Sequence, residues 1–283
     1  MQSQAPQAPV VRAGVTRGQR VIQEPEAPIS LPSRERILMY GREGTGKTES
    51  WLSIAEMFPV PFYVIDTDDS VQRMLETDHP GLSNIHTVVA QGWAEFEKGV
   101  DDSIMRIRKY VEGLKPPLGK EQLPWLVVDF ADATWDMVQN YYTEQVFNQG
   151  IDEYFLLARK GNKNSKQLQP LEGWTDWQVI NKIFQSRWNV LTKGGGPFHL
   201  YITAKAVDLA GDIESKSLYK ALKKMPGGEK RMGGRVHTVL MSSVDQEGWY
   251  LSTAKDRGRP ILSNQKSVNF AISYLLKTAG WRP

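Results

Sequence analysis

One stretch near the start of the chain has the residue types that bind phosphate. Gly41-Arg-Glu-Gly-Thr-Gly-Lys-Thr48 fits the pattern G-x-x-x-x-G-K-[ST]. Glycines let the backbone turn successive N–H groups toward an anion, and the positive end of the following helix dipole points at the same place. Lys47 would reach the β- and γ-phosphates, and the Thr48 hydroxyl would ligate Mg²⁺. The stretch predicts a nucleoside triphosphate site made by Gly41, Arg42, Glu43, Gly44, Thr45, Gly46, Lys47, Thr48 and Glu49.

The segments around this stretch have the patterns that such a loop needs. Residues 36–40 are a short apolar run typical of a buried strand, and residues 48–57 have helical spacing. Strand-like and helix-like segments then alternate, which predicts an α/β fold with a mainly parallel central sheet flanked by helices. We expect further strands over 61–66, 86–90, 125–130 and 199–203, helices over 94–114, 134–148, 177–192 and 267–279, and a C-terminal β-hairpin over 236–253.

A carboxylate is needed near the phosphates to hold the water shell of Mg²⁺. Leu126-Val-Val-Asp129 places one directly after apolar residues, at the carboxyl end of a predicted strand. Ligands of open α/β sheets bind at that edge. We therefore expect Asp129 to hold Mg²⁺ together with Thr48, with Asp132 as a weaker candidate. An ordinary aspartate of a turn is the alternative interpretation.

Three more acids follow the strand predicted over residues 61–66. Hydrolysis needs a group that orients and deprotonates the attacking water, and Asp66, Asp68 or Asp69 could face the γ-phosphate. The same segment also fits a capped turn, because Asp-Asp-Ser suits the start of a helix at Val71. The residues alone leave both interpretations open.

The order of these features resembles RecA-like ATPases. In particular, the chain is similar to the bacteriophage P-loop proteins grouped with single-strand-annealing, RecA-like recombination ATPases. The resemblance covers roughly residues 34–275. It implies a RecA-like P-loop NTPase fold that hydrolyses ATP in a homo-oligomer, a ring or a filament, with active sites between subunits. The matching segments are 41–48, 66–68, 127–129, 173–177, 199–205 and 252–259.

The resemblance assigns roles to residues that composition and spacing leave unassigned. The catalytic glutamate of the family falls on Asp68, whose side chain is one methylene shorter. The polar sensor at the end of the fourth strand falls on Thr203 or Lys205, where RecA itself has glutamine. A charged lysine contacts phosphate but cannot accept a proton from water.

The resemblance also implies a cationic finger that acts on the neighbouring subunit. Lys255-Asp-Arg257 matches the Lys-x-Arg pair that RecA-like ATPases insert into the neighbour's nucleotide site, and Arg259 is the reserve candidate. Such fingers contribute factors of about 10³ to 10⁵ in rate. A solvated basic turn after the hairpin is the alternative interpretation. The predicted catalytic residues are therefore Lys47, Asp68, Asp129, Lys255 and Arg257.

Two basic stretches stand where RecA-like proteins contact DNA. Cations beside flexible backbone suit a phosphate track without base readout, and they predict binding of single-stranded DNA. A plain solvated surface explains the same lysines. Tyr219 is the one aromatic residue within the second stretch, and Trp174 and Trp177 either stack on bases or pack in the core. The cations are Arg159, Lys160, Lys163 and Lys166 in the first stretch, and Lys220, Lys223, Lys224, Lys230, Arg231 and Arg235 in the second.

Composition narrows the remaining possibilities. The 283 residues carry a net charge of +3, include no cysteine, and place four histidines without metal-ligand spacing. Cysteine-ligated zinc and disulfides are thus excluded, and the composition suits a cytoplasm, that of a host cell if the protein is phage-encoded. No apolar run is long enough for a membrane span. Residues 1–33, rich in Gln, Pro and Ala, are expected to form a flexible arm, or one that docks on a neighbouring subunit, before an ATPase domain over 34–283.

Together these features predict a Mg-ATP-dependent ATPase that binds single-stranded DNA in phage recombination or replication. A phage single-strand-binding or recombination protein is a further expected partner. Two rival functions stay open. A small-molecule P-loop kinase would use residues 205–235 as a lid, and a nucleotide-dependent switch or adaptor with weak hydrolysis would explain the short acid at 68 and the lysine at 205.

Overall fold

A computed structural model describes residues 32–159, 175–194, 196–209 and 218–282. The arm expected over residues 1–33 lies outside the described residues except for its last two. The first basic stretch lies outside them except for the backbone of Arg159. The strands are β1 Arg36–Gly41, β2 Phe62–Asp66, β3 Ile85–Val89, β4 Trp125–Asp129, β5 His199–Asp208, β6 Lys224–Pro226, β7 Thr238–Asp245, β8 Gly248–Asp256 and β9 Gln265–Ser267.

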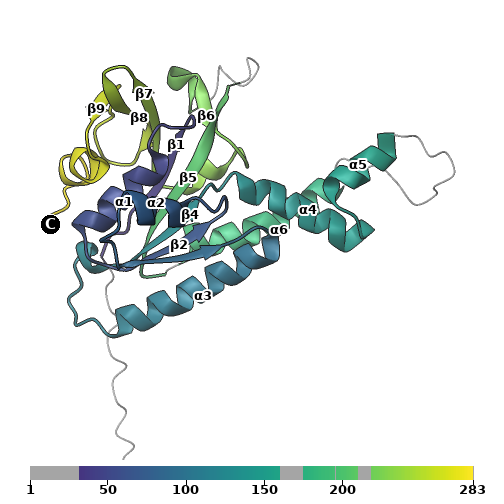
Figure 1. The fold of residues 1–283 in the computed structure, drawn as a ribbon, viewed down its shortest axis with the longest axis horizontal. Coiled ribbons are helices and arrows are strands. Elements are labelled where there is room, and N and C mark those ends of the chain that lie inside the picture. The colour runs from purple at the N-terminus through teal and green to yellow at the C-terminus, as the bar shows by residue number, and fades with distance from the viewer. Residues whose placement is uncertain (1–31, 160–174, 195, 210–217, 283) are drawn as a thin grey trace, which may run out of the picture. The chain divides into compact units, whose positions relative to one another are not determined.

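The strands form one sheet with the order β3-β2-β4-β5-β1-β7-β8-β9, and β6 pairs with β5 outside this path (Figure 1). The pairs from β3 to β7 are parallel, and β7–β8 and β8–β9 are antiparallel. The expected fold class is confirmed: a mainly parallel sheet flanked by helices, with a β-hairpin near the C-terminus. The helices are α1 Lys47–Met57, α2 Val71–Thr77, α3 Trp93–Glu112, α4 Ala133–Phe147, α5 Ile151–Arg159, α6 Thr175–Thr192 and α7 Met232–Arg235, with short turns η1 Lys120–Gln122, η3 Lys220–Leu222 and η4 Ala271–Leu276.

Both faces of the sheet are covered, so successive residues of the central strands enter different cores. In β1, Ile37 and Met39 join the cluster that contains α1 and η4, and Leu38 and Tyr40 join the cluster that contains α3, α4 and α6. All four side chains are fully buried. Since β1 is covered on both faces and paired on both edges, its carboxyl end is a rigid base for the loop that follows.

Three expected elements differ from the structure by three or more residues. Strand β5 continues to Asp208 instead of ending at Thr203, because Ala206–Asp208 pair with β6. Strand β8 continues to Asp256, so Lys255 belongs to the sheet and not to a basic turn. The C-terminal helix expected over 267–279 is wrong in its first part, because β9 occupies residues 265–267 as an edge strand on β8 and a single π-helical segment follows over 271–276.

Candidate active site at the carboxyl edge of the sheet

The phosphate-binding pattern forms a loop between β1 and α1. Gly44 and Gly46 have φ angles of 71° and 74°, a left-handed conformation that glycine adopts without steric cost. Gly41 is required for another reason. A Cβ atom at Gly41 would lie 2.3 Å from the hydroxyl oxygens of Thr45 and Ser242, closer than any van der Waals contact allows. The Thr45 hydroxyl, 2.9 Å from that of Ser242, ties the loop to β7.

Lys47 is the first residue of α1 and is 4 % exposed. Its ammonium group donates a hydrogen bond of 2.8 Å to the carbonyl oxygen of Arg42 and lies 5.2 Å from the ring centroid of Phe130. Burial lowers the pKa of Lys47, and the nearby carboxylates of Asp129 and Asp132 oppose this shift. The cation is thus held at the centre of the loop, among acids.

Asp129 ends β4 and is fully buried beside the start of α1. Its carboxylate accepts hydrogen bonds from the hydroxyl of Thr203 and from Nε1 of Trp51, the latter over 3.2 Å. Burial raises the pKa of Asp129, while bonds from Thr203, Trp51 and the Thr48 hydroxyl lower it. The structure therefore brings Thr48 and Asp129 together, as the sequence predicted for the two Mg²⁺ ligands.

Thr203 connects β4 and β5 at this edge. Its hydroxyl donates to Asp129 and accepts a 2.8 Å hydrogen bond from the backbone N–H of Phe130. Phe130 has a φ of 65°, a region that a bulky residue rarely adopts and that costs of order 1–3 kcal/mol. Directly after β2, the Thr67 hydroxyl donates to the carbonyl oxygens of Asp129 and Phe130 over 2.8 and 2.9 Å. Hydrogen bonds from two neighbouring strand ends thus fix the backbone after β4.

The two acids at the end of β2 are in different environments. Asp66 is buried and accepts hydrogen bonds from the N–H groups of Val71, at 2.9 Å, and of Asp68, at 3.2 Å. Burial raises the pKa of Asp66 to about 6. Asp68 is exposed and accepts a 2.7 Å bond from the hydroxyl of Ser70, and its charge raises the pKa of Asp129. Asp66 therefore caps α2, whereas Asp68 faces solvent close to Asp129.

Lys205 of β5 contacts both the loop and Asp132. The ammonium group of Lys205 is 3.6 Å from the carboxylate of Glu43, which belongs to the loop itself. The backbone N–H of Lys205 donates to the Asp132 side chain over 3.1 Å. Asp132 in turn touches Gly228, where a Cβ atom would lie 2.9 Å from the Cα of Asp132. Of the two predicted sensor positions, Thr203 contacts the acid and Lys205 contacts the loop.

The donor set at this edge fits a magnesium nucleotide. Mg²⁺ prefers oxygen ligands and is usually bound through one or two protein oxygens plus substrate phosphates and water. Thr48 and Asp129 provide such oxygens, and Lys47 provides a buried cation for phosphate oxygens. Among the described residues, no cluster of three or more His, Asp or Glu side chains is arranged to hold a metal by itself.

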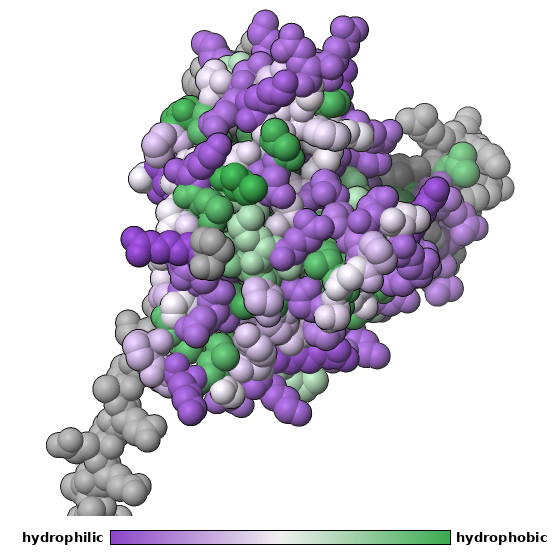
Figure 2. Space-filling view, turned by 60° about the vertical axis from the view of Figure 1, so that its left-hand side comes forward, coloured by the Kyte–Doolittle hydropathy of each residue, from purple (hydrophilic) through white to green (hydrophobic). Residues whose placement is uncertain are grey.

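Sequence reasoning missed a cavity beside the loop and the tryptophan that borders it. The cavity has a volume of about 380 Å³ and lies between the start of α1 and strands β8 and β9. Trp249 of β8 is 51 % exposed, and its indole lies against Gly46. Figure 2 turns the left-hand side of Figure 1 toward the viewer and shows apolar side chains (green) gathered among hydrophilic ones (purple) on that side. The lining residues include Thr45, Gly46, Glu49, Ser50, Ser242, Trp249, Val268 and Asn269.

Glu49, also predicted as a nucleotide-binding residue, borders this cavity and contacts a buried histidine. One ring nitrogen of His79 is 2.9 Å from Glu49 and the other is 2.7 Å from Glu56. Burial lowers the pKa of His79, but the hydrogen bonds to the two carboxylates outweigh burial and raise it. The bridge ties the segment after α2 to α1.

The residues of the predicted finger lie at the other end of the sheet from the loop. Lys255 of β8 pairs with Val239 of β7, which pairs with Leu38 of β1. Lys255 is therefore level with Leu38, three residues or about 10 Å along the strand direction from Gly41. The ammonium group of Lys255 donates to the carbonyl oxygens of Gly233, Gly234 and Val236 at 2.6–3.4 Å. Arg257 and Arg259 line a different cavity, at the start of β1, so none of the three cations contacts the nucleotide loop of its own subunit.

Arg257 and Arg259 differ from each other in their contacts. Arg257 is exposed, and no hydrogen bond or ion pair of its side chain is found within the described part of the chain. Arg259, the reserve candidate, forms a bidentate ion pair with the buried Glu35 at 2.6 and 2.9 Å. Arg259 therefore stabilises the fold, and Arg257 is the accessible cation.

The second basic stretch is partly neutralised by local partners. Lys224 pairs with Asp208, and Arg231 and Arg235 lie beside Glu229. Tyr219 is buried against Tyr40. Trp177 stacks on Trp135 and packs against a hydrophobic core, which agrees with the core interpretation of this tryptophan. Trp174 lies outside the described residues. Between 218 and 235, the exposed lysines without an observed ion pair are Lys220, Lys223 and Lys230.

The mainly parallel sheet, the glycine-rich loop after β1 and the buried acid at the end of β4 together have the arrangement of a P-loop fold. No protein-family model matches the chain, and no curated protein matches it. Among solved structures, the RadB recombinase matches with 12 % identity and a TM-score of 0.41, over 80 % of this chain and 83 % of that one. The ATPase EscN also matches, with 12 % identity and a TM-score of 0.40. Its structure shows EscN assembled with its central stalk EscO from the type III secretion system of enteropathogenic E. coli.

The EscN match covers 76 % of this chain and 42 % of that one. Both likenesses are distant, so the assignment of the site depends on the residues described above. None of the helices in the described ranges has the length and hydropathy needed to cross a lipid bilayer.

Proposed function

We propose that the chain is a RecA-like ATPase that binds Mg-ATP at the carboxyl edge of its sheet. The observation that supports this most directly is the buried cluster of Lys47, Thr48 and Asp129 at the start of α1. Lys47 binds the β- and γ-phosphates, and Thr48 and Asp129 hold Mg²⁺, which supplies charge neutralisation on the phosphates when bound. The loop N–H groups between Gly41 and Thr48 bind the remaining phosphate oxygens.

Asp68 is our candidate for the group that orients the attacking water. It is exposed, lies close enough to Asp129 to raise its pKa, and is free of the helix-capping role that Asp66 performs. The cavity beside the loop accommodates the nucleobase, with Trp249 as the flat apolar surface on which it stacks. Glu49 and Asn269 at the same cavity offer polar partners to the base or ribose.

The active site requires a second subunit. Because Arg257 lies far from the loop of its own chain and is exposed, we place it at the nucleotide of a neighbouring copy in a homo-oligomeric ring or filament. A guanidinium at that position stabilises charge on the transferring phosphoryl group. Lys255 holds the segment in place through its three carbonyl contacts.

Single-stranded DNA is the proposed regulator, in recombination or replication of phage DNA, together with a phage single-strand-binding or recombination protein. The described residues that support DNA binding are Lys220, Lys223 and Lys230. Replacing all three by Gln is expected to reduce the slope of log affinity against log salt by about 2, since each phosphate contact on a single strand contributes about 0.7. The matched control replaces Lys98, Lys109 and Lys115, which are exposed elsewhere, and should leave the slope unchanged.

The decisive test is ATP hydrolysis by the purified chain, with and without single-stranded DNA, over a range of protein concentrations. We expect DNA-stimulated release of inorganic phosphate that rises per subunit with concentration and is abolished by Lys47→Ala. Normal hydrolysis by that variant would refute the assignment. Tight ATP binding without turnover would indicate the nucleotide switch instead, and phosphate transferred to an acceptor would indicate the kinase.

A further inference from the structure

A second cavity lies at the opposite end of β1 from the nucleotide loop. It has a volume of about 510 Å³, and its charged lining residues are Arg34, Glu35, Arg36, Asp256, Arg257 and Arg259. We call it the arginine pocket. Arg36 begins β1 and Gly41 ends it, so five residues of strand, about 16 Å, separate this pocket from the nucleotide loop.

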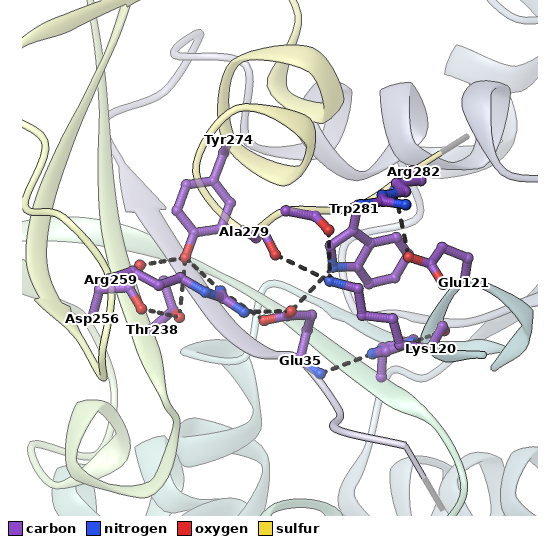
Figure 3. A network of polar contacts seen from close by, with 12 residues as sticks. Glu35, Lys120, Glu121, Thr238, Asp256, Arg259, Tyr274, Ala279, Trp281 and Arg282 are labelled. Carbon is purple, nitrogen blue, oxygen red and sulfur yellow. Dashed lines mark hydrogen bonds and ion pairs between the residues drawn. The ribbon is translucent and has the colours of Figure 1, made fainter. Parts of the chain in front are cut away.

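Both carboxylates of the arginine pocket are already occupied by other partners. Glu35, which is 3 % exposed, accepts two hydrogen bonds from Arg259 and one of 3.1 Å from Nε1 of Trp281 (Figure 3). Asp256 accepts hydrogen bonds from the hydroxyl groups of Thr238, at 3.1 Å, and Tyr274, at 2.5 Å. Arg259 therefore neutralises Glu35, whereas Asp256, fixed by two hydroxyls, keeps its negative charge at the edge of the pocket.

The other three arginines outnumber this one carboxylate, and none of them is paired with it. Arg34 donates to the carbonyl oxygen of Gly196, and across the described ranges no carboxylate forms an ion pair with Arg34, Arg36 or Arg257. Burial and the charge of Arg34 lower the pKa of Arg36. Burial, followed by the charges of Arg36 and Arg257, lowers the pKa of His237, which also lines the pocket. Like charges thus converge on a partly buried cavity, which is unfavourable unless an anion joins them.

We propose that the arginine pocket binds a phosphate group, held by Arg36 and Arg257 with Arg34 beside them. The guanidinium fork matches the geometry of phosphate oxygens and retains its charge when partly buried. The volume accommodates a diphosphate with some of its water. Two sources supply this chemistry: free phosphate or pyrophosphate, and the phosphates of a nucleotide bound to a second copy of this chain. The second source rests on the proposed function; the first does not.

The experiment is calorimetric titration of inorganic pyrophosphate into the full chain that carries Lys47→Ala, which removes phosphate binding at the nucleotide loop. We expect one site, weakened at least about tenfold by Arg36→Gln and by Arg257→Gln. The matched controls are Arg73→Gln and Arg106→Gln, two exposed arginines elsewhere. Arg257 is exposed, so its variant should keep the melting temperature of the parent, which separates lost binding from misfolding. Absence of binding, or equal affinity in the arginine variants and controls, would overturn the proposal.

A second assay separates the two sources of phosphate. Lys47→Ala protein, which keeps the arginine pocket, is mixed with the Arg36→Gln/Arg257→Gln variant, which keeps the nucleotide loop. Hydrolysis in the mixture above that of either protein alone assigns the pocket to a neighbour's nucleotide. Pyrophosphate binding without such recovery assigns it to free phosphate. If the wild-type chain hydrolyses no ATP while pyrophosphate still requires Arg36 and Arg257, the ATPase proposal fails and the arginine pocket stands.

Discussion

Replacement of Thr203 by valine tests how the structure holds the buried acid of the active site. The hydroxyl of Thr203 donates to the carboxylate of Asp129 and accepts from the N–H of Phe130, and the residue is fully buried. Valine has nearly the same shape, so the substitution creates no cavity. It leaves the partly buried N–H of Phe130 without an acceptor and removes one of the hydrogen bonds to a buried carboxylate.

The magnitude follows from these two losses. A buried unsatisfied N–H costs about 1–3 kcal/mol, and a hydrogen bond to a charged group contributes about 1.5–3 kcal/mol. The extra methyl group returns part of this, about 1 kcal/mol. We therefore expect Thr203→Val to lower the free energy of unfolding by about 2–4 kcal/mol, measured by urea titration without nucleotide. Thr203→Ser keeps the hydroxyl and is expected to cost about 1 kcal/mol for the lost methyl group.

The pH dependence separates the two losses. Burial already raises the pKa of Asp129, so charging this group destabilises the folded state as pH rises from its unfolded pKa through its folded pKa. Removing the Thr203 hydroxyl raises the folded pKa further. The difference between Thr203→Val and the wild type should then be larger at pH 8 than at pH 5.5. Equal stability of the valine and serine variants, or a cost independent of pH, would refute this account of the site.

Four other substitutions test neighbouring parts of the site. Trp249→Ala is expected to weaken ATP binding about 5- to 100-fold, by loss of stacking, and to leave inorganic triphosphate binding unchanged in calorimetry. Asp68→Asn should lower kcat and leave the melting temperature unchanged. Asp66→Asn should lower the free energy of unfolding by about 1 kcal/mol, because it weakens the cap at the start of α2. The opposite pair of results would exchange the roles of the two acids. The pKa of His79 is raised in the folded state, so its bridge to the two glutamates stabilises the fold fully below pH 6.5. This stabilisation is lost as pH rises through the folded pKa. The urea midpoints of the wild type and of His79→Gln should therefore converge at alkaline pH.

The sequence predicted the parts of the site that depend on local pattern. The loop over 41–48 requires glycine at fixed positions, and an apolar run followed by an acid predicts a strand that ends at the ligand edge of the sheet. Both strand ends, at Asp66 and Asp129, therefore lie where the pattern placed them, at paired positions of β2 and β4. The alternation of short apolar runs and helical spacing was sufficient for the fold class.

Contacts between distant segments could not be predicted in this way. Trp249 borders the cavity beside the loop only because β8 returns along β7, which pairs with β1. Its signal in the sequence is an aromatic residue just after a hairpin turn, which equally fits an edge strand. The assignment of Asp66 to the cap of α2 depends on two backbone N–H groups, whose positions no residue pattern specifies.

The Lys-x-Arg pair at 255–257 shows why residue type and spacing are insufficient for a finger. Both cations have the charge and length to reach a neighbour's phosphate, and the pattern treats them alike. In the structure, the ammonium group of Lys255 donates to Gly233 over 2.9 Å and to Val236 over 2.6 Å, where it holds the end of α7. Reaching across an interface would break these bonds and leave the carbonyl groups to be solvated again. Arg257 loses no such bond when it meets an anion, so the role that we propose in a neighbouring site falls to the arginine alone.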